Sequence, residues 1–210
     1  MKRKEILTAF VLAVFSIVVL SSFILSVDAP VIKGYHIGSE VADINLLNVD
    51  NKMVSFSDFK DAKGFIVIFT CNTCPFAVAS EDRINALDAE FKTKGYPVIA
   101  INPNDPSVQP DDTFVLMQQK AKEKDFTFPY LYDESHKVYA EFGAAKTPHV
   151  YLVQKENGKK IVKYIGAIDD NVRNASSVKE RFLANAIYEL LAGKEITLKE
   201  TKAIGCSVKV

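Results

Sequence analysis

One stretch decides the fold of this 210-residue chain: Gly64-Phe-Ile-Val-Ile-Phe-Thr-Cys-Asn-Thr-Cys-Pro75. Residues 64–70 form a continuous, largely apolar run, a pattern typical of a central strand that is buried on both faces. The run leads into a Cys-x-x-Cys pair, Cys71 and Cys74, and Pro75 suits the first turn of a helix. The sequence therefore predicts a buried strand that delivers two thiols to the start of a helix.

The sequence beyond this stretch alternates between helix and strand patterns. Apolar residues at helical spacing follow the cysteines and predict the inner face of a helix that stops near Gly95: Val78, Ile84, Leu87 and Phe91. Residues 97–102 indicate a second buried strand. Residues 64–102 are therefore predicted to form one βαβ unit with a right-handed crossover.

Further elements complete the pattern on both sides. Two hairpins are predicted, one with strands at 44–49 and 53–56 around Asp50-Asn51, the other with strands at 150–153 and 161–165 around Asn157-Gly158. The remaining elements are a helix capped by Asp111 or Asp112, a strand at 128–131, a helix from Asp133 to Phe142, and a last helix that opens with the capping-box spacing Ser177 to Glu180 and ends at Gly193. This order predicts an α/β protein with a mixed central β-sheet and helices on both faces.

The composition excludes several classes of protein. Hydrophobic residues make up 48% of the chain and charged residues 25%, which are ordinary values for a globular protein. The 26 Lys and Arg residues balance the 26 Asp and Glu residues, so no basic surplus favours nucleic acid, and we expect no nucleic-acid partner. Three cysteines are too few for a small disulfide-stapled fold, so a packed core must supply the stability.

The N-terminus is a separate element. Three basic residues, Lys2 to Lys4, precede an uncharged stretch at residues 6–27, which as a helix spans about 33 Å, enough to cross a bilayer. The positive-inside rule keeps the basic residues in the cytoplasm and places the rest of the chain outside it. We expect residues 1–30 to be a cleaved signal peptide or, preferably, a single-span membrane anchor, followed by an extracytoplasmic domain at 31–193 and a C-terminal tail at 194–210.

The Cys71–Cys74 pair is the strongest chemical signal. A helix N-terminus stabilises a thiolate through its dipole and free N–H groups, and Cys71 is expected to be the more exposed and more acidic thiol. In thiol–disulfide exchange one thiolate attacks a substrate disulfide, and the second thiol resolves the mixed disulfide. We therefore predict an oxidoreductase with Cys71 as the nucleophile and Cys74 as the resolving cysteine. No cofactor is expected, because the cysteine pair carries the electrons.

Three other uses of the cysteines remain open. An exported protein can hold a structural disulfide at this position. A zinc site needs about four ligands, which Cys206 and one of His36, His136 or His149 would have to complete. Thiolates and an imidazole also suit copper, so a copper-binding chaperone is a further alternative. The chain has no second paired cysteine motif, and we expect no bound metal.

Six stretches carry a family pattern: residues 38–46, 54–59, 65–75, 100–105, 132–135 and 142–152. In them the chain resembles the thioredoxin-fold redoxins, the group that holds the alkyl hydroperoxide reductase/thiol-specific antioxidant proteins. A peroxiredoxin-like subgroup with a C-x-x-C motif is also similar at residues 166–171 and 204–209. The resemblance covers about residues 38–193 and implies a thioredoxin-like fold with an N-terminal β-hairpin extension.

The resemblance also implies roles near Pro148. In thioredoxin folds the proline at this place is cis and faces the C-x-x-C pair, and the residue before it, here Thr147, pairs with an extended substrate. His149 is a candidate proton relay, with an ordinary strand residue as the alternative. We expect the tail to fold back along the domain with Cys206 as an accessory thiol, and a packed cysteine without a redox role is the alternative.

The chain departs from the family patterns at several positions. It has no tryptophan, Thr70 stands directly before the cysteine pair, and the central strand carries no acid of the kind that thioredoxins use as a proton acceptor. No cysteine has a threonine three residues before it, which is the peroxidatic pattern of peroxiredoxins. We therefore predict exchange with protein dithiols and disulfides and with an unidentified electron donor, and a thiol-dependent peroxidase is the alternative.

Overall fold

The computed structural model describes residues 34–210. The predicted signal peptide or anchor at residues 1–30, with its uncharged span at 6–27, lies outside the described residues. Within residues 34–210, no helix is both long enough and apolar enough to cross a membrane.

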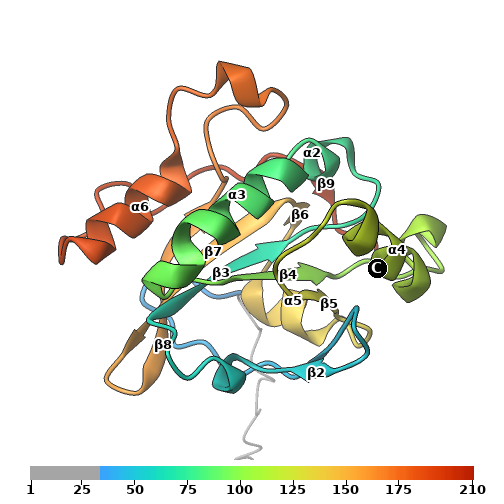
Figure 1. Ribbon diagram of the computed structural model, residues 1–210, viewed down its shortest axis with the longest axis horizontal. Coiled ribbons are helices and arrows are strands. Elements are labelled where there is room, and N and C mark those ends of the chain that lie inside the picture. Colours follow the sequence, from blue (N-terminus) through green and yellow to red (C-terminus); the bar gives the residue numbers. More distant parts are fainter. Residues whose placement is uncertain (1–33) are drawn as a thin grey trace, which may run out of the picture. The chain divides into compact units, whose positions relative to one another are not determined.

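A seven-stranded mixed sheet is the centre of the described region (Figure 1). In spatial order its strands are β2 (Met53–Val54), β1 (Leu46–Asn48), β5 (Tyr130–Tyr132), β4 (Val98–Asn102), β3 (Gly64–Phe69), β7 (His149–Glu156) and β8 (Lys159–Gly166). β3, β4 and β5 run parallel to one another, whereas β7 is antiparallel to β3 and to β8. β1 pairs antiparallel with both β2 and β5. The predicted α/β class and mixed sheet are confirmed.

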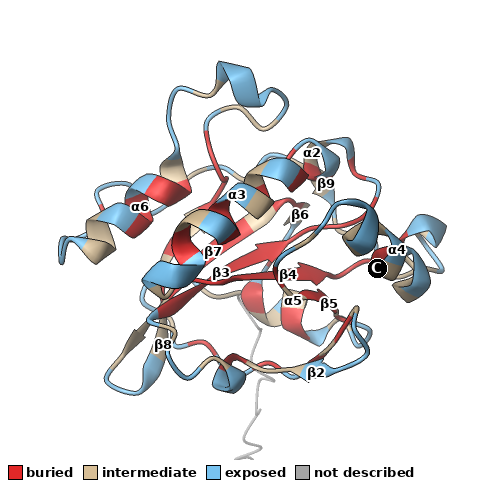
Figure 2. Cartoon of the chain, in the orientation of Figure 1, coloured by how far each residue is buried: buried red, intermediate tan, exposed pale blue. Residues whose placement is uncertain are grey.

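β3 is buried along its whole length, as its apolar run predicts (Figure 2). Successive side chains of a strand point to opposite faces of the sheet. Ile66 and Ile68 therefore pack in one hydrophobic cluster, and Val67 and Phe69 pack in another. The protein thus has a core on each side of its central strand.

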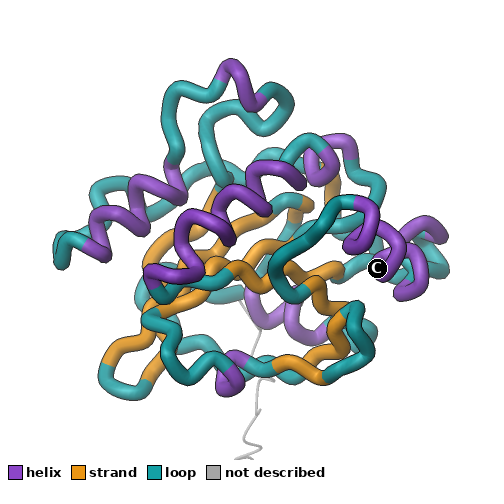
Figure 3. The backbone as a smooth tube through the Cα atoms, viewed as in Figure 1, coloured by secondary structure: helices purple, strands orange, loops and turns teal. Residues whose placement is uncertain are grey.

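Helices cover both faces of the sheet (Figure 3). One cluster holds side chains from α3 (Glu81–Phe91), α4 (Phe114–Glu123) and α6 (Phe182–Leu191). The other holds side chains from α5 (Lys137–Phe142) together with the segment from Val41 to Phe56. This layering is the thioredoxin-like arrangement that the redoxin resemblance implies.

The helix predicted after the cysteines is interrupted. α2 (Pro75–Val78) ends after one turn, and α3 begins at Glu81. Val78 is 38% exposed instead of facing the core, whereas Ile84 and Leu87 of α3 are buried. The apolar spacing holds for α3 but not for the short turn that carries Cys74 at its start.

Three predicted helix starts are wrong. α5 begins at Lys137 with His136 as its N-cap residue instead of Asp133, although the Asp133 carboxylate accepts the Tyr139 N–H of its first turn. α4 is capped by Thr113, whose hydroxyl accepts a backbone N–H of the first turn, so neither Asp111 nor Asp112 is the cap. α6 begins at Phe182 without a side-chain cap, and the residues at 177–180 precede it without forming the predicted capping box. Asp112, which was predicted as a possible cap of α4, is completely buried.

The turn between β7 and β8 and the end of α6 agree with the prediction. Asn157 and Gly158 have φ values of 51° and 80°, the left-handed conformation that a type I′ hairpin turn requires at both central positions. Gly193 follows α6 with a φ of 68°, which is the usual way for glycine to end a helix.

The tail folds back along the domain, as predicted. Thr201 pairs through its backbone N–H with the carbonyl oxygen of Ile165 in β8. Further along, β9 (Cys206–Ser207) pairs antiparallel with β6 (Lys146–Thr147) in a separate two-stranded sheet. This second sheet was not predicted from the sequence.

Candidate functional site

Both cysteines of the C-x-x-C pair lie just beyond the carboxyl end of β3. Cys71 is in the loop that leaves the strand, and Cys74 is the N-cap residue of α2. Each is 5% exposed, so the expectation that Cys71 is the more exposed thiol is wrong. Both are free thiols in the structure.

Thr147 is the residue that both thiols contact. Cys71 Sγ lies 3.3 Å from Thr147 Oγ1, and the protonated Cys74 thiol donates to the Thr147 carbonyl oxygen at 3.1 Å. The peptide bond from Thr147 to Pro148 is cis, as the redoxin resemblance implies. The structure thus brings Cys71, Cys74, Thr147 and Pro148 together, although 73 residues separate Cys74 from Thr147.

Cys206 reaches the same place from the tail. It stands directly opposite Thr147 in the β6–β9 pairing, and its backbone N–H donates to Cys74 Sγ at 3.4 Å. Its side chain packs against the small cluster formed by Cys71, Cys74 and Ala77. Three thiols therefore meet around one threonine.

Hydrogen bonding within the pair separates the pKa values of the two thiols. The hydrogen bond between the two thiols is the main cause of both shifts. It lowers the pKa of Cys74 to about 4 and raises the pKa of Cys71 well above its usual range. Contacts with Cys206 and the Ala77 N–H lower the pKa of Cys74 further, whereas burial and the Asp112 carboxylate raise that of Cys71. These directions are opposite to the predicted order of the two pKa values, and their first cause is the hydrogen bond between the two thiols.

A buried carboxylate fixes the backbone between the cysteines. Asp112 accepts the Asn72 N–H at 2.7 Å with one oxygen and the Asn104 side-chain amide at 2.6 Å with the other. The Tyr130 hydroxyl donates to the Asn72 side chain at 3.0 Å. These groups are buried, and each hydrogen bond in such surroundings holds its partners firmly because no water replaces it.

The role of Asp112 was not predicted. β3 carries no acid, and the acid beside the cysteines comes instead from the segment that follows β4. One signal was present: the carboxyl ends of parallel strands meet at one edge of a sheet, where α/β proteins place functional side chains. Asn102 ends β4 and Asn104 follows it closely, so polar groups beside the cysteines were foreseeable.

His149 lies beside the site but hydrogen-bonds elsewhere. Its Nδ1 accepts the Ala145 N–H at 3.3 Å and lies 3.5 Å from the Tyr151 hydroxyl. Burial lowers the pKa of His149 to about 4, so its ring is neutral at pH 7. Across residues 34–210, no three or more His, Cys, Asp or Glu side chains are grouped so as to hold a metal ion.

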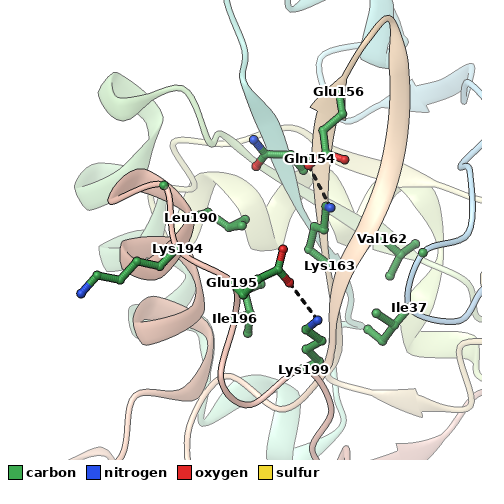
Figure 4. Close-up of a pocket in the computed structure, with 12 residues that line it drawn as sticks. Ile37, Gln154, Glu156, Val162, Lys163, Leu190, Lys194, Glu195, Ile196 and Lys199 are labelled. Atoms are coloured by element: carbon green, nitrogen blue, oxygen red, sulfur yellow. Dashed lines mark hydrogen bonds and ion pairs between the residues drawn. The ribbon is translucent and has the colours of Figure 1, made fainter.

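A separate hollow lies away from the thiols. Residues of β7, β8 and the segment after α6 line it, with no cysteine among them (Figure 4). Four of its charged groups form two ion pairs, Lys163 with Glu156 at 2.8 Å and Lys199 with Glu195 at 3.0 Å. The reactive groups are therefore at Thr147 and not in this hollow.

A thioredoxin-like fold that sets two thiols and a cis-proline together at the end of its central strand defines a redoxin. Residues 37–165 match the AhpC/TSA family. The chain belongs to that family.

Three individual proteins are similar to the chain. The thiol-disulfide oxidoreductase ResA from Oceanobacillus iheyensis is 28% identical over 131 residues, which cover 60% of this chain and 64% of that protein, so the match spans less than two thirds of the relative. An uncharacterized conserved protein from Geobacillus kaustophilus has a TM-score of 0.77 and 31% identity over 85% of this chain and 94% of its own. A hypothetical protein from Sinorhizobium meliloti 1021 has a TM-score of 0.77 and 29% identity, over 84% and 96%.

Proposed function

We propose that this chain is a thiol–disulfide oxidoreductase that exchanges electrons with protein substrates through Cys71 and Cys74. The observation that carries the proposal is the contact of both thiols with Thr147, next to the cis peptide bond. The family match and the similarity to an oxidoreductase support the same reaction. The two cysteines store the electron pair as thiols and release it as a disulfide, so the exchange needs no prosthetic group.

Cys74 is the attacking thiol in this proposal. Its lowered pKa favours the thiolate, and on losing its proton Cys74 gives up the hydrogen bond to the Thr147 carbonyl oxygen. It is also the thiol in contact with the strand paired to Thr147. The Cys74 thiolate attacks one sulfur of a substrate disulfide, the other substrate sulfur leaves as a thiolate, and a mixed disulfide forms. Cys71 then attacks Cys74, expels the second substrate thiolate and closes the Cys71–Cys74 disulfide. This order reverses the roles predicted from the sequence.

Thr147 provides the docking edge for the substrate. An extended peptide can add to an exposed strand through main-chain hydrogen bonds, which bind many sequences equally well. β6 already accepts one such strand, β9 of the tail. A protein disulfide docked in the same register would present its sulfur to Cys74.

Trapping experiments test the proposal and its order of attack. Variants are made in a Cys206→Ser background, so that only two thiols remain. Cys71→Ser should accumulate a mixed disulfide with a peptide disulfide, because Cys74 attacks and nothing resolves the product. Cys74→Ser should trap none. Trapping by Cys74→Ser alone would restore Cys71 as the nucleophile, and trapping by neither variant would reject the pair as the redox centre.

Peroxide reduction is the second candidate function, and the match to the AhpC/TSA family favours it. Any thiolate with a lowered pKa reacts with peroxide to some degree. The missing threonine three residues before each cysteine argues against a dedicated peroxidase. Stopped-flow mixing with hydrogen peroxide and with a peptide disulfide separates the two, because peroxide consumption far faster than exchange would assign the chain as a peroxidase.

We also propose that the domain works outside the cytoplasm and is tethered to the membrane by residues 6–27. The support is the order of the N-terminal sequence, three basic residues followed by an uncharged stretch long enough to span a bilayer. Most of the protein should therefore remain in the membrane fraction after a high-salt wash. A soluble mature form that begins near Pro30 would reject the anchor and leave export intact.

A further inference from the structure

The proposed function uses Cys71 and Cys74 and gives no role to the third thiol. β9 runs antiparallel to β6 with Cys206 opposite Thr147, which is the pairing that an extended substrate strand makes with a docking edge. In this register the Cys206 N–H contacts Cys74 Sγ at 3.4 Å. The tail is therefore paired with the edge at which the proposed function docks a substrate, and it carries a cysteine beside Cys74.

Gly205 lets the tail come this close. A Cβ atom added at Gly205 would lie 2.2 Å from the carbonyl oxygen of Thr147, a distance that no side chain tolerates. Any other residue at this position would push the tail away from β6 directly before Cys206. The approach thus depends on the absence of a side chain.

The tail is also held on the far side of Cys206. The Lys209 N–H donates to the Asn104 side-chain oxygen at 2.9 Å, and the Asp105 N–H donates to the Lys209 carbonyl oxygen at 2.7 Å. Asn104 in turn donates to the buried Asp112. Together with the hydrogen bond from Thr201 to Ile165, these contacts keep Cys206 beside the pair.

We propose that Cys206 is a third exchanging thiol, which the tail presents to Cys74 as a tethered substrate cysteine. The inference rests on the proposed function. The Cys206 thiolate attacks the Cys74 sulfur of the Cys71–Cys74 disulfide, so that the Cys74–Cys206 bond forms as the Cys71–Cys74 bond breaks. Cys71 leaves as a thiolate and takes up the proton that Cys206 released. The step moves a disulfide without net oxidation, so it needs no further reactant.

This transfer moves the disulfide from a buried to a more accessible place. Cys71 is buried, whereas Cys206 is partly exposed in the tail. In the reduced protein, burial and the contact with Cys74 raise the pKa of Cys206 to about 11. Once Cys74 is part of a disulfide it carries no charge, so its share of this effect disappears and Cys206 ionises more readily.

The test uses the full chain with Cys71→Ser and glutathione disulfide as the probe. Cys74 should take up glutathione, and Cys206 should then displace it, so mass mapping should find a Cys74–Cys206 disulfide and little retained glutathione. The matched control, Cys71→Ser with Cys206→Ser, should keep glutathione on Cys74. Adding Gly205→Ala to Cys71→Ser should slow the displacement at least tenfold, whereas adding Ser207→Ala should leave its rate unchanged.

The outcomes separate the inference from the proposed function. Glutathione retained on Cys74 of the Cys71→Ser variant, to the same extent as in the control, would overturn the role of Cys206 alone, provided that wild-type chain still forms the Cys71–Cys74 disulfide. A wild-type chain that forms no such disulfide would overturn the proposed function. A Cys71→Ser variant with neither adduct nor disulfide would reject Cys74 as the attacking thiol and the inference with it.

Discussion

The two segments that meet at Thr147, residues 71–74 and the tail strand at 205–209, are held in different ways. The first leaves a completely buried strand, and its backbone is fixed by the buried Asp112. The second is joined by a two-residue strand and a few main-chain hydrogen bonds. The residues at its margins, Ile204 and Val210, are 47% and 54% exposed.

This difference corresponds to two functions within one site, positioning of the sulfur atoms and docking of the substrate. Exchange requires that the two sulfurs keep a fixed distance and direction, and a buried polar network provides such positions. Docking of varied substrates requires contacts that form and break and that do not depend on sequence, and main-chain strand pairing provides these. The comparison predicts large effects on stability from the first segment and effects mainly on exchange from the second.

The largest effect is expected from Asp112→Ala. The substitution leaves the Asn72 N–H and the Asn104 amide buried without their acceptor, which should lower the free energy of unfolding by about 3–5 kcal/mol. Urea unfolding measures the change. The neighbouring Asp111→Ala is the matched control, because Asp111 is exposed and Asn72 bonds only its main-chain oxygen. Equal losses in both variants would contradict the anchoring role of Asp112.

The second prediction concerns the pH dependence of the thiols. A pKa of about 4 for Cys74 means that its thiolate persists at every pH above that value and is lost only as the pH falls through it. The rate of Cys74 labelling by iodoacetamide should thus stay nearly constant from pH 6 to 8, where an ordinary thiol of pKa about 8.5 gains roughly a hundredfold. Mass spectrometry of the labelled peptides gives the rate at each cysteine.

The same pH titration shows which of the two segments has the larger influence on the pKa of Cys74. The hydrogen bond with Cys71 is the first cause of the lowered pKa of Cys74, and the tail contributes less. Cys71→Ala should therefore raise the pKa of Cys74 more than Cys206→Ser does. A larger rise with Cys206→Ser would assign control of the thiolate to the tail and reverse the comparison.

The third prediction is that removal of the tail helps protein substrates. A chain that ends at Ala203 lacks β9 and exposes β6, so exchange with a protein disulfide should rise about tenfold, the equivalent of about 1.4 kcal/mol of tail pairing. Exchange with glutathione disulfide, which needs no docking strand, should change little. Cys206→Ser in the full chain is the control for the lost thiol. Slower exchange with both disulfides would show that the tail supports the site instead of covering it.

Local signals allowed most of the fold to be predicted, and long-range contacts account for what could not be. The apolar run of β3 and the turn at Asn157-Gly158 are read from neighbouring residues, and so is the position of Cys71 and Cys74 at the end of a strand. Asp112 looks like an exposed loop acid in sequence, because its burial depends on Asn72, 40 residues away. The two-residue β9 is too short to show a strand periodicity.

The predicted order of the two thiol pKa values differs from the structure for a related reason. The prediction assigned the effect of the helix N-terminus to Cys71, whereas Cys74 is the N-cap residue of α2. The first cause of the lowered Cys74 pKa is the hydrogen bond with Cys71, and such a bond between two side chains is not visible in the sequence. Element boundaries are also the least certain part of a sequence-based prediction.

The smallest effect is expected from Ser207→Ala, which tests whether main-chain contacts dominate in the tail. The Ser207 hydroxyl accepts from Lys146 Nζ at 3.1 Å in an exposed position, and such a contact contributes at most about 0.5 kcal/mol. Stability and exchange should therefore stay within about twofold of the wild type, since the β6–β9 pairing is unchanged. Gly205→Ala, two residues away, inserts a side chain against the Thr147 carbonyl oxygen and should raise exchange with a protein disulfide as truncation does. A strong effect of Ser207→Ala, equal to that of Gly205→Ala, would mean that side chains select what binds at β6.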